Sequence, residues 1–261
     1  MTAASRPPRV TSTRPMIQVI ELHKTFGEYK VLTGINVTVP EGSTCVILGG
    51  SGSGKTVLMK HMIGLLKPDS GQVIIDGEDI VPLGEERLEV VRRKFGMVFQ
   101  AAALFDSMNV YDNVAFPLRE HRKQLSEEQI RTLVRSKLDL MGLPRTAEAK
   151  FPADLSGGMR KRVGLARAIV MDPKIVLYDE PTTGLDPITT DYVDEMILAA
   201  QRELRVTSVV ISHDIASAFN VADYIAFLSK GVIVEFGPPE QLRNSQHEAV
   251  KVFLQTWFGK N

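Results

Sequence analysis

The segment Gly49–Thr56 combines glycines, hydroxyl groups and one lysine at a spacing that suits phosphate binding. Its sequence, GGSGSGKT, matches the pattern G-x-x-x-x-G-K-[ST]. The glycines let the backbone curl so that consecutive N–H groups face one anion, and a following helix adds the positive end of its dipole. In such a loop Lys55 reaches the β- and γ-phosphates of a nucleoside triphosphate, and the Thr56 hydroxyl binds Mg²⁺. The alternative, a flexible Gly/Ser loop, does not explain the apolar strand before this segment or the apolar helix after it.

Two adjacent carboxylates provide a second set of reactive groups. Asp179 and Glu180 follow the apolar run Ile175–Tyr178, which we expect to be a buried strand. A carboxylate at the end of a buried strand can hold Mg²⁺, which suits Asp179. Glu180 leaves the strand and can polarise a water that attacks the γ-phosphate. Two acids at a strand end are common by themselves, so the phosphate-binding loop is what favours the catalytic interpretation.

The segment Leu155–Met159 separates this chain from small kinases and GTPases, which share the loop and the acids. Its sequence, LSGGM, resembles the LSGG signature of ATP-binding cassette (ABC) ATPases and stands shortly before the carboxylates, as in that family. A Gly-rich helix start offers a hydroxyl and N–H groups to an anion, although an ordinary capped helix start has the same composition. In the family this anion is the γ-phosphate of ATP bound to the other subunit. The resemblance therefore implies a homodimer in which Ser156, Gly157 and Gly158 complete the partner's site.

Four further positions match the family in order along the chain. Gln100 resembles the glutamine that contacts Mg²⁺ and the attacking water, and His213 resembles the histidine that hydrogen-bonds the γ-phosphate. Asp186 resembles the D-loop residue at the dimer interface. Phe26 stands where the family places an aromatic ring for adenine to stack on; that ring is often tyrosine, and Tyr29 is close by.

The motifs and the resemblance together imply ATP and Mg²⁺ as ligands. The expected catalytic residues are Lys55, Gln100, Glu180 and His213. The expected nucleotide-binding residues are Phe26, Gly49, Ser51, Gly52, Ser53, Gly54, Lys55, Thr56, Val57, Ser156, Gly157, Gly158 and Asp186. The expected Mg²⁺ ligands are Thr56, Gln100 and Asp179.

Two segments narrow the resemblance to one branch of the family. The stretches FQAAALFDSM and NVAFPLRE, within residues 99–120, and the sequence LSGGMRKRV are similar to Mla/Mce-type lipid-transport ATPases. In the family, the segment that corresponds to residues 99–120 contacts the coupling helix of the permease. The resemblance therefore implies that an integral-membrane, MlaE-like permease docks near residues 101–118. The resemblance also implies a small STAS-like regulatory subunit, an MCE-type lipid-binding protein and phospholipid as the cargo, in maintenance of outer-membrane lipid asymmetry. An amino acid or another small solute is the alternative cargo.

The strands and helices that must position these groups alternate along the chain. Thr44–Leu48 is continuously apolar in character, as is typical of a central parallel strand, and it leads directly into the phosphate-binding loop. Residues 208–211 predict another buried strand, and residues 224–236 predict a hairpin that turns at Lys230-Gly231. Residues 101–170 show no convincing strand, and Ser126 with Gln129 predicts a capping box at the start of a helix there.

The resemblance implies an α/β fold: a RecA-like P-loop NTPase core, an N-terminal antiparallel β subdomain and an inserted α-helical signature subdomain. We expect a disordered cytosolic tail (1–15), an ABC ATPase domain (core and β subdomain 16–100 and 171–243, helical subdomain 101–170) and a C-terminal helical extension (244–261). A short plastid transit peptide is the alternative for the tail. The apolar residues of the extension recur at helical spacing; they are Val250, Phe253, Leu254, Trp257 and Phe258. This apolar face could pack on the chain's own core or on a neighbouring subunit. Contact with the membrane is the least favoured alternative, because the extension carries few positive charges.

Composition limits the binding partners and the cellular location that the sequence allows. The 261 residues carry a formal net charge of zero, which gives no field for attracting nucleic acid, and the single cysteine, Cys45, suits a reducing compartment. No stretch approaches the roughly 18 apolar residues of a membrane span, so a membrane role requires a partner. We therefore expect a peripheral protein on the cytoplasmic face of the inner membrane. Soluble ABC ATPases of translation carry two cassettes and those of DNA repair a long coiled coil, and the sequence shows neither.

Overall fold

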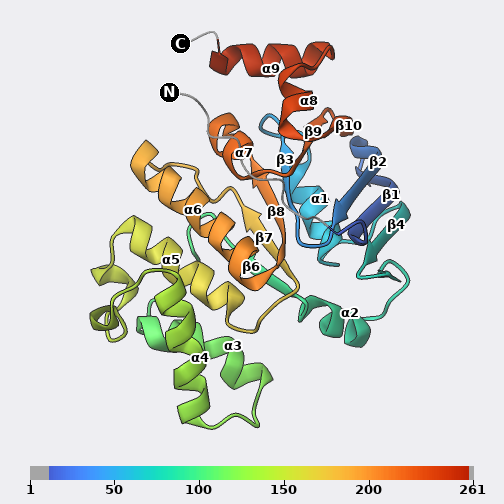
Figure 1. Ribbon diagram of the computed structural model, residues 1–261. Helices are drawn as coiled ribbons and strands as arrows, with labels where there is room; N and C mark the ends of the chain where they lie inside the picture. The colour runs from blue at the N-terminus through green and yellow to red at the C-terminus, as the bar shows by residue number, and fades with distance from the viewer. Residues whose placement is uncertain (1–11, 259–261) are drawn as a thin grey trace.

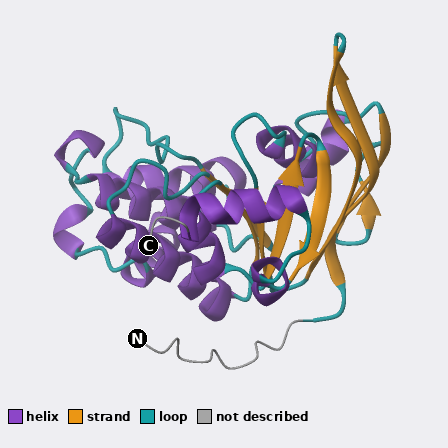
Figure 2. Ribbon diagram, turned by 90° about the horizontal axis from the view of Figure 1, so that it is seen from above, coloured by secondary structure: helices purple, strands orange, loops and turns teal. Residues whose placement is uncertain are grey.

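The computed structural model describes residues 12–258, with side chains as far as Gln255. Most of the predicted tail lies outside the described residues, and Pro15 already belongs to the first strand. Two sheets stand side by side and a group of helices extends from the larger one (Figure 1). Seen from above, the strands gather on one side of the molecule and most of the helices on the other (Figure 2).

The smaller sheet is antiparallel and has the strand order β2-β1-β4-β5. Its strands are β1 (Pro15–Phe26), β2 (Tyr29–Pro40), β4 (Ser70–Ile75) and β5 (Glu78–Asp79). The first two have 12 residues each and continue into a hairpin at Phe26 and Tyr29. This sheet is the expected N-terminal antiparallel β subdomain.

The larger sheet has the order β10-β9-β3-β8-β7-β6. Its strands are β3 (Thr44–Leu48), β6 (Phe95–Val98), β7 (Ile175–Asp179), β8 (Thr207–Ser212), β9 (Tyr224–Ser229) and β10 (Val232–Gly237). Every neighbouring pair is parallel except β9 and β10, which form the predicted hairpin. Strands β3 and β8 are buried along their whole length, as a sheet covered on both faces requires.

The register brings the carboxyl ends of the parallel strands to one edge of this sheet. Leu48 at the end of β3 pairs with Ser212 at the end of β8, and Asp179 at the end of β7 pairs with Ile211. Because ligands of open α/β sheets bind outside the carboxyl ends of the strands, this edge is where a site is expected.

The helices cover both faces of the larger sheet. They are α1 (Lys55–Met62), α2 (Glu85–Arg92), α3 (Val110–His121), α4 (Glu127–Leu140), α5 (Gly157–Ile169), α6 (Pro187–Leu204), α7 (Ile215–Val221), α8 (Pro239–Arg243) and α9 (Glu248–Phe258). Along the strands of the larger sheet, side chains belong alternately to two hydrophobic cores. One core lies between the two sheets and includes α1, and the other lies between the larger sheet and helices α3–α7. Residues 101–170 contain α3, α4, α5 and two short 3-10 turns, Arg145–Ala147 and Pro152–Asp154. The predicted capping box of Ser126 and Gln129 opens α4.

The C-terminal helix α9 packs on the chain's own core over the part whose side chains are described. Val250 is 0% exposed and Leu254 6%. Phe253 meets the ring of Phe227 on β9 with the centroids 5.0 Å apart. The side chains of Trp257 and Phe258 lie outside this part. Within residues 12–258, none of the helices combines the length and apolar character that crossing a bilayer requires.

Candidate functional site

The segment Gly49–Thr56, called the phosphate loop below, connects β3 to α1 and needs glycine at specific positions. Gly54 has φ of 106°, and a Cβ there would lie 2.8 Å from Leu32 Cδ2. A Cβ at Gly49 would collide with the backbone oxygen of Leu228. Only glycine adopts this backbone and tolerates this packing without strain, so the two residues fix the path of the loop.

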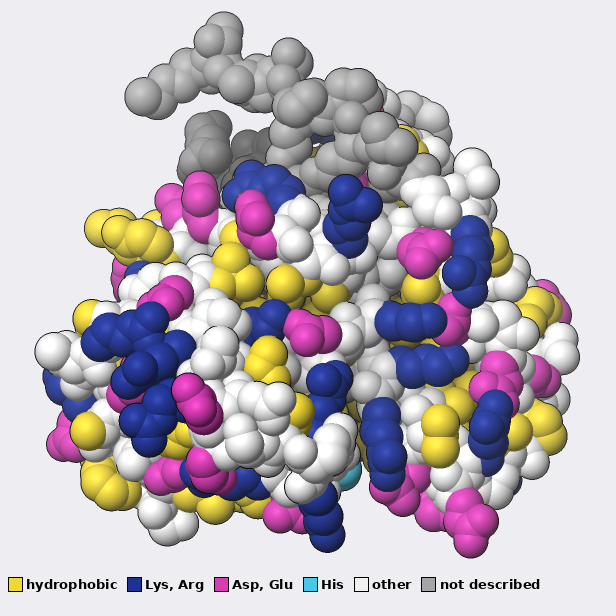
Figure 3. Space-filling model, turned by 60° about the horizontal axis from the view of Figure 1, so that its bottom comes forward, with side chains coloured by type: hydrophobic (Ala, Val, Ile, Leu, Met, Phe, Trp, Pro, Cys, Tyr) yellow, Lys and Arg dark blue, Asp and Glu magenta, His cyan; other side chains and the backbone are white. Residues whose placement is uncertain are grey.

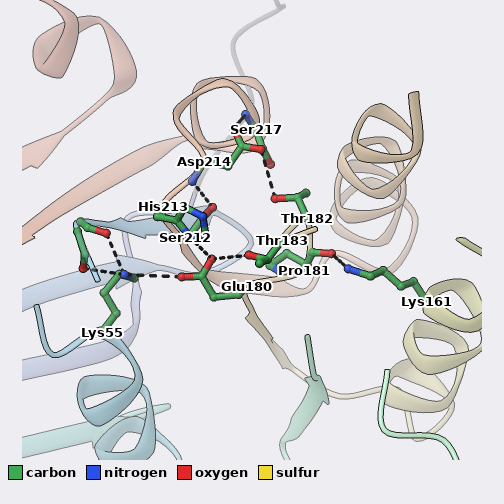
Figure 4. Close-up of polar contacts among 12 residues, drawn as sticks. Lys55, Lys161, Glu180, Pro181, Thr182, Thr183, Ser212, His213, Asp214 and Ser217 are labelled. Carbon is green, nitrogen blue, oxygen red and sulfur yellow. Dashed lines mark hydrogen bonds and ion pairs between the residues drawn. The ribbon is translucent and has the colours of Figure 1, made fainter. Parts of the chain in front are cut away.

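Lys55 is the first residue of α1, and its side chain folds back over the loop. It is only 7% exposed, and Nζ donates hydrogen bonds to the carbonyl oxygens of Gly49 at 2.8 Å and Gly50 at 3.0 Å. Nζ also lies 3.7 Å from Glu180 Oε1 (Figure 4). The lysine therefore places a positive charge within the loop and opposite the predicted base.

A cavity of about 290 Å³ opens at the phosphate loop. Its lining consists of Val31, Ser51, Gly52, Ser53, Gly54, Lys55, Thr56, Val57, Glu180 and His213. The Oγ atom of Ser53 is buried without a hydrogen-bond partner among the described residues. A buried hydroxyl normally has a partner, so this atom fits a loop that receives a polar ligand. The glycine-rich backbone, the ammonium group and this hydroxyl together form a donor set suited to a triphosphate.

Glu180 follows β7 with its backbone in the left-handed region, at φ of 49°. Its N–H donates to Ile211 O at 3.0 Å, which holds the backbone against β8. Its Oε2 accepts hydrogen bonds from Thr183 Oγ1 at 3.0 Å and from His213 Nδ1 at 2.7 Å (Figure 4). A non-glycine residue in this conformation is uncommon and is typical of functional sites. The surrounding contacts hold the carboxylate toward Lys55.

His213 lies against the predicted base, whereas the resemblance implied a contact with the γ-phosphate. It follows β8 and precedes Asp214, whose side chain caps α7 by accepting from Ser217 N at 3.2 Å. Asp214 Oδ2 also lies 3.5 Å from the hydroxyl of Thr182, next to the turn that carries the base. The histidine and the glutamate are thus held by adjoining turns.

Asp179 ends β7 beside Glu180. Burial first, and then the negative charge of Glu180, raise the pKa of Asp179 above its ordinary value. A nearby cation would stabilise the negative charges of these two adjacent carboxylates, one of which is partly buried. Mg²⁺ prefers oxygen ligands of this kind. Thr56, which lines the cavity, offers a hydroxyl from the first turn of α1. The residue types fit Mg²⁺.

The signature segment, Leu155–Met159, presents its polar groups to solvent. Leu155 is 4% exposed and anchors the segment in the core, while Ser156 and Gly157 are exposed. Ser156 caps α5, and its Oγ accepts from the N–H of Met159 at 3.2 Å. No residue of this segment is among those that line the cavity at the chain's own phosphate loop. Within one chain, the signature segment is therefore separate from the cavity at the phosphate loop.

Besides Gly49, Asp179 and the signature residues, three further predicted residues lie outside the cavity lining. Gln100 is exposed just after β6. Phe26 is 45% exposed at the end of β1, with Lys24 Nζ 5.4 Å from its ring centroid. Asp186 caps α6 by accepting from Thr189 N at 3.0 Å. The structure brings together the phosphate loop, Glu180 and His213, and it leaves these three as predictions.

Sequence reasoning missed two residues that contribute to the site. Thr183 donates to the carboxylate of Glu180, and Val31 lines the cavity from β2. A threonine three residues after a predicted base is a weak signal, because many turns contain one. Val31 carried no signal, since its place beside the phosphate loop depends on how the two sheets stand together.

A groove of about 490 Å³ opens on the face that comes forward in Figure 3, between α2, β6, α3 and α5. Its apolar lining includes Phe95, Met97, Phe99, Phe105 and Phe116, and its charged residues are Glu89, Arg92, Arg93 and Arg167. Figure 3 shows Lys and Arg side chains along the middle of this face. Arg167 on α5 donates to the carbonyl oxygens of Ala102 and Ala103, each at 2.9 Å. Both alanines are left-handed, with φ of 62° and 47°. Helix α5, which Ser156 caps, thus also holds the segment where permease docking is predicted.

Comparisons with known proteins identify the family of the chain. The family model described as "ABC transporter" matches residues 32–183. The phospholipid transport ATP-binding protein MlaF of Escherichia coli K12 is 39% identical over 243 residues, which cover 93% of this chain and 90% of that protein. The probable ribonucleotide transport ATP-binding protein mkl of Mycobacterium tuberculosis H37Rv is 46% identical over 238 residues, or 91% of this chain. The chain spans 66% of the length of this mycobacterial relative.

Solved structures show the same fold. CbiO1 from Clostridium perfringens, part of the ABC transporter complex cbiONQ, superposes with a TM-score of 0.83 at 30% identity, covering 94% of this chain and 96% of that chain. A dimeric post-hydrolysis structure of the ATP-binding cassette MJ0796, bound to ADP and Pi, gives a TM-score of 0.77 at 31% identity, covering 86% and 99% of the two chains. The RecA-like core with a β subdomain and a helical subdomain is thus the architecture of ABC cassettes.

The replacement Lys55→Ala tests the phosphate loop. Removing the ammonium group should weaken binding of a fluorescent ATP analogue by about tenfold to a hundredfold, because a hydrogen bond to a charged group contributes roughly 1.5–3 kcal/mol. Binding is measured by fluorescence titration. Lys67→Ala, at an exposed lysine after α1, is the matched control and should keep the affinity. Equal affinity of Lys55→Ala and the control would contradict the assignment.

Proposed function

The chain belongs to the ABC transporter family, and from that premise we propose that it is the ATP-binding and ATP-hydrolysing subunit of a transporter. The observation that carries this proposal is the placement of Glu180 between Lys55, at 3.7 Å, and His213, at 2.7 Å, on the wall of the phosphate-loop cavity. A carboxylate held beside a triphosphate-binding loop is positioned to act on water at the γ-phosphate.

The residues of the phosphate loop hold the triphosphate. Backbone N–H groups and the hydroxyl of Ser53 donate to its oxygens, and Lys55 exchanges its contacts with loop carbonyls for contacts with phosphate. When bound, Mg²⁺ neutralises charge on the phosphate oxygens; Thr56 and Asp179 would hold it, with Gln100 as the further predicted ligand. The positive groups act mainly by stabilising charge that develops as the terminal phosphate leaves.

Glu180 acts as the general base. Thr183 and His213 both donate to Oε2, so Oε1, which faces Lys55, is the oxygen left to take a proton. The oxygen of the attacking water forms a bond to the γ-phosphorus, its proton passes to Oε1, and the bond between the γ-phosphorus and the bridging oxygen breaks. ADP and phosphate are the products.

The protein acts as a homodimer in this proposal. The exposed Ser156 and Gly157 of one copy close on the triphosphate in the phosphate loop of the other, which makes two equivalent sites in a two-fold dimer. Support comes from the separation of the signature segment from its own phosphate loop. Asp186 and Phe26, both exposed, have predicted roles at the dimer interface and at adenine.

An integral-membrane permease docks in the groove beside residues 101–118, and hydrolysis changes its state. The apolar floor and basic residues of the groove suit a helix that presents apolar and acidic side chains. The free energy for coupling is the difference in affinity of the open and closed dimers for ATP and ADP. The chain itself is peripheral, on the cytoplasmic face of the inner membrane.

The cargo that we propose is phospholipid, moved across the cell envelope in maintenance of outer-membrane lipid asymmetry. Similarity to MlaF over 90% of that protein supports this, together with the Mla/Mce-type sequence around the groove. An MlaE-like permease, a STAS-like regulatory subunit and an MCE-type lipid-binding protein complete the proposed complex. An amino acid or another small solute is the alternative cargo.

The replacement Glu180→Gln tests the base. Turnover should fall by about a hundredfold or more, because the amide cannot take the proton, while ATP binding persists and a closed ATP-bound dimer accumulates. Phosphate release and size-exclusion chromatography with ATP measure these effects. Glu240→Gln, at an exposed glutamate of α8, should behave as the unmodified protein. Normal turnover of Glu180→Gln would remove Glu180 from this role.

Purification of the native complex from membranes tests the cargo. The complex should contain a permease and an MCE-type subunit, and lipid extraction followed by mass spectrometry should find phospholipid above the level of a mock purification. A complex with a solute-binding protein and no enriched phospholipid would contradict the phospholipid assignment while leaving the ATPase assignment intact.

A further inference from the structure

A lysine on the signature helix reaches across to the turn that carries the catalytic glutamate. Lys161 lies in the second turn of α5, after Ser156 and the two glycines. Its Nζ donates a hydrogen bond to the backbone oxygen of Pro181, the residue directly after Glu180. Figure 4 shows Lys161 and Lys55 approaching this turn from opposite sides. Neither the motifs nor the proposed chemistry accounts for this contact.

The environment of Lys161 is unusual for a lysine. The side chain is half-buried, and among the described residues no carboxylate forms an ion pair with it. Burial alone lowers its pKa below the ordinary value. Its stem lies over a small apolar cavity whose lining includes Val98, Leu165, Tyr178 and Ile197. Burying a cation without a counter-ion costs free energy, so the hydrogen bond to Pro181 O must offset that cost.

The bonded carbonyl belongs to a tight turn. Thr183 N–H donates to Glu180 O at 3.3 Å, and Leu185 N–H donates to Thr182 O at 3.2 Å. The backbone of Glu180 is left-handed, so the direction of its side chain depends on how the following peptides are held. Proline has no N–H and cannot anchor the turn as a donor. Its carbonyl, which belongs to the peptide shared with Thr182, accepts the hydrogen bond from Lys161 of α5.

We propose that Lys161 is a positioning residue that couples the signature end of α5 to Glu180 of the same chain. The inference rests on the proposed function, in which Ser156 contacts the partner's ATP while Glu180 acts on the chain's own ATP. Ser156 and Lys161 lie on one continuous helix, so engagement of the signature segment moves the Lys161 ammonium with it. The contact to Pro181 O then orients Glu180. ATP at one site of the dimer thereby prepares the base of the other site.

The variant Lys161→Met tests this coupling because it keeps the length and apolar stem of the side chain and removes the donor. We expect kcat to fall by about tenfold while KM for ATP stays within about twofold, since Lys161 is not among the residues that line the phosphate-loop cavity. The Hill coefficient for ATP should fall from near the number of sites, about two, toward one. Lys161→Arg, which retains a cationic donor, should restore most of kcat and the cooperativity.

The variant Lys137→Met is the matched control. Lys137 is also a largely buried lysine of the helical subdomain, but it pairs with Asp172 at 2.6 Å, away from the turn. It should lower thermal stability and keep kcat and the Hill coefficient.

Four outcomes would overturn the inference. Unchanged kcat and Hill coefficient in Lys161→Met would show that the contact does not position the base. Equal losses of kcat in Lys161→Met and Lys137→Met would show that the role of Lys161 is merely structural. The same conclusion would follow if Lys161→Arg did not restore kcat and the cooperativity. An unmodified protein without ATPase activity would contradict the proposed function as well, whereas an active protein with an unaffected Lys161→Met contradicts this inference alone.

Discussion

The contact between Lys55 and Glu180 is the interaction on which the site depends. The two side chains, 7% and 17% exposed, bring their opposite charges within 3.7 Å at the carboxyl edge of the larger sheet. Each reduces the cost of burying the other, and each has further hydrogen bonds, to the phosphate loop and to His213. The parallel register of β3, β8 and β7 brings them to one edge although they are far apart in sequence.

Helix α5 connects the carboxyl edge of the larger sheet to the other parts of the proposed transporter. Its first residues form the exposed signature segment, Lys161 contacts the turn after Glu180, and Arg167 donates to the left-handed backbone of Ala102 and Ala103 beside the groove. Buried residues such as Val163 and Ile169 fix the helix in the core. In the proposed function, this one helix links three places that must communicate: the partner's nucleotide, the chain's own base and the permease.

The sequence predicted the elements that depend on local pattern. Thr44–Leu48 and the capping box at Ser126 match the structure, because apolar runs and capping chemistry depend on neighbouring residues. The phosphate loop and its association with Glu180 followed from motif spacing. The contact of Lys161 with Pro181 and the position of Val31 depend on how distant segments pack, and no local pattern specifies that. The sequence likewise did not predict the left-handed backbone of Glu180, because hydrogen bonds to β8 and within the following turn impose it.

The central claim, that each ATP site is built from two chains, is tested most directly by heterodimers isolated with two affinity tags. All chains carry Glu180→Gln so that bound ATP is retained. When Lys55→Ala is in one chain and Ser156→Arg in the other, a shared site predicts one retained ATP per dimer. When both replacements are in one chain and neither in its partner, it predicts none. The reverse, one ATP in the second arrangement and none in the first, would show that each site lies within a single chain and would contradict the account.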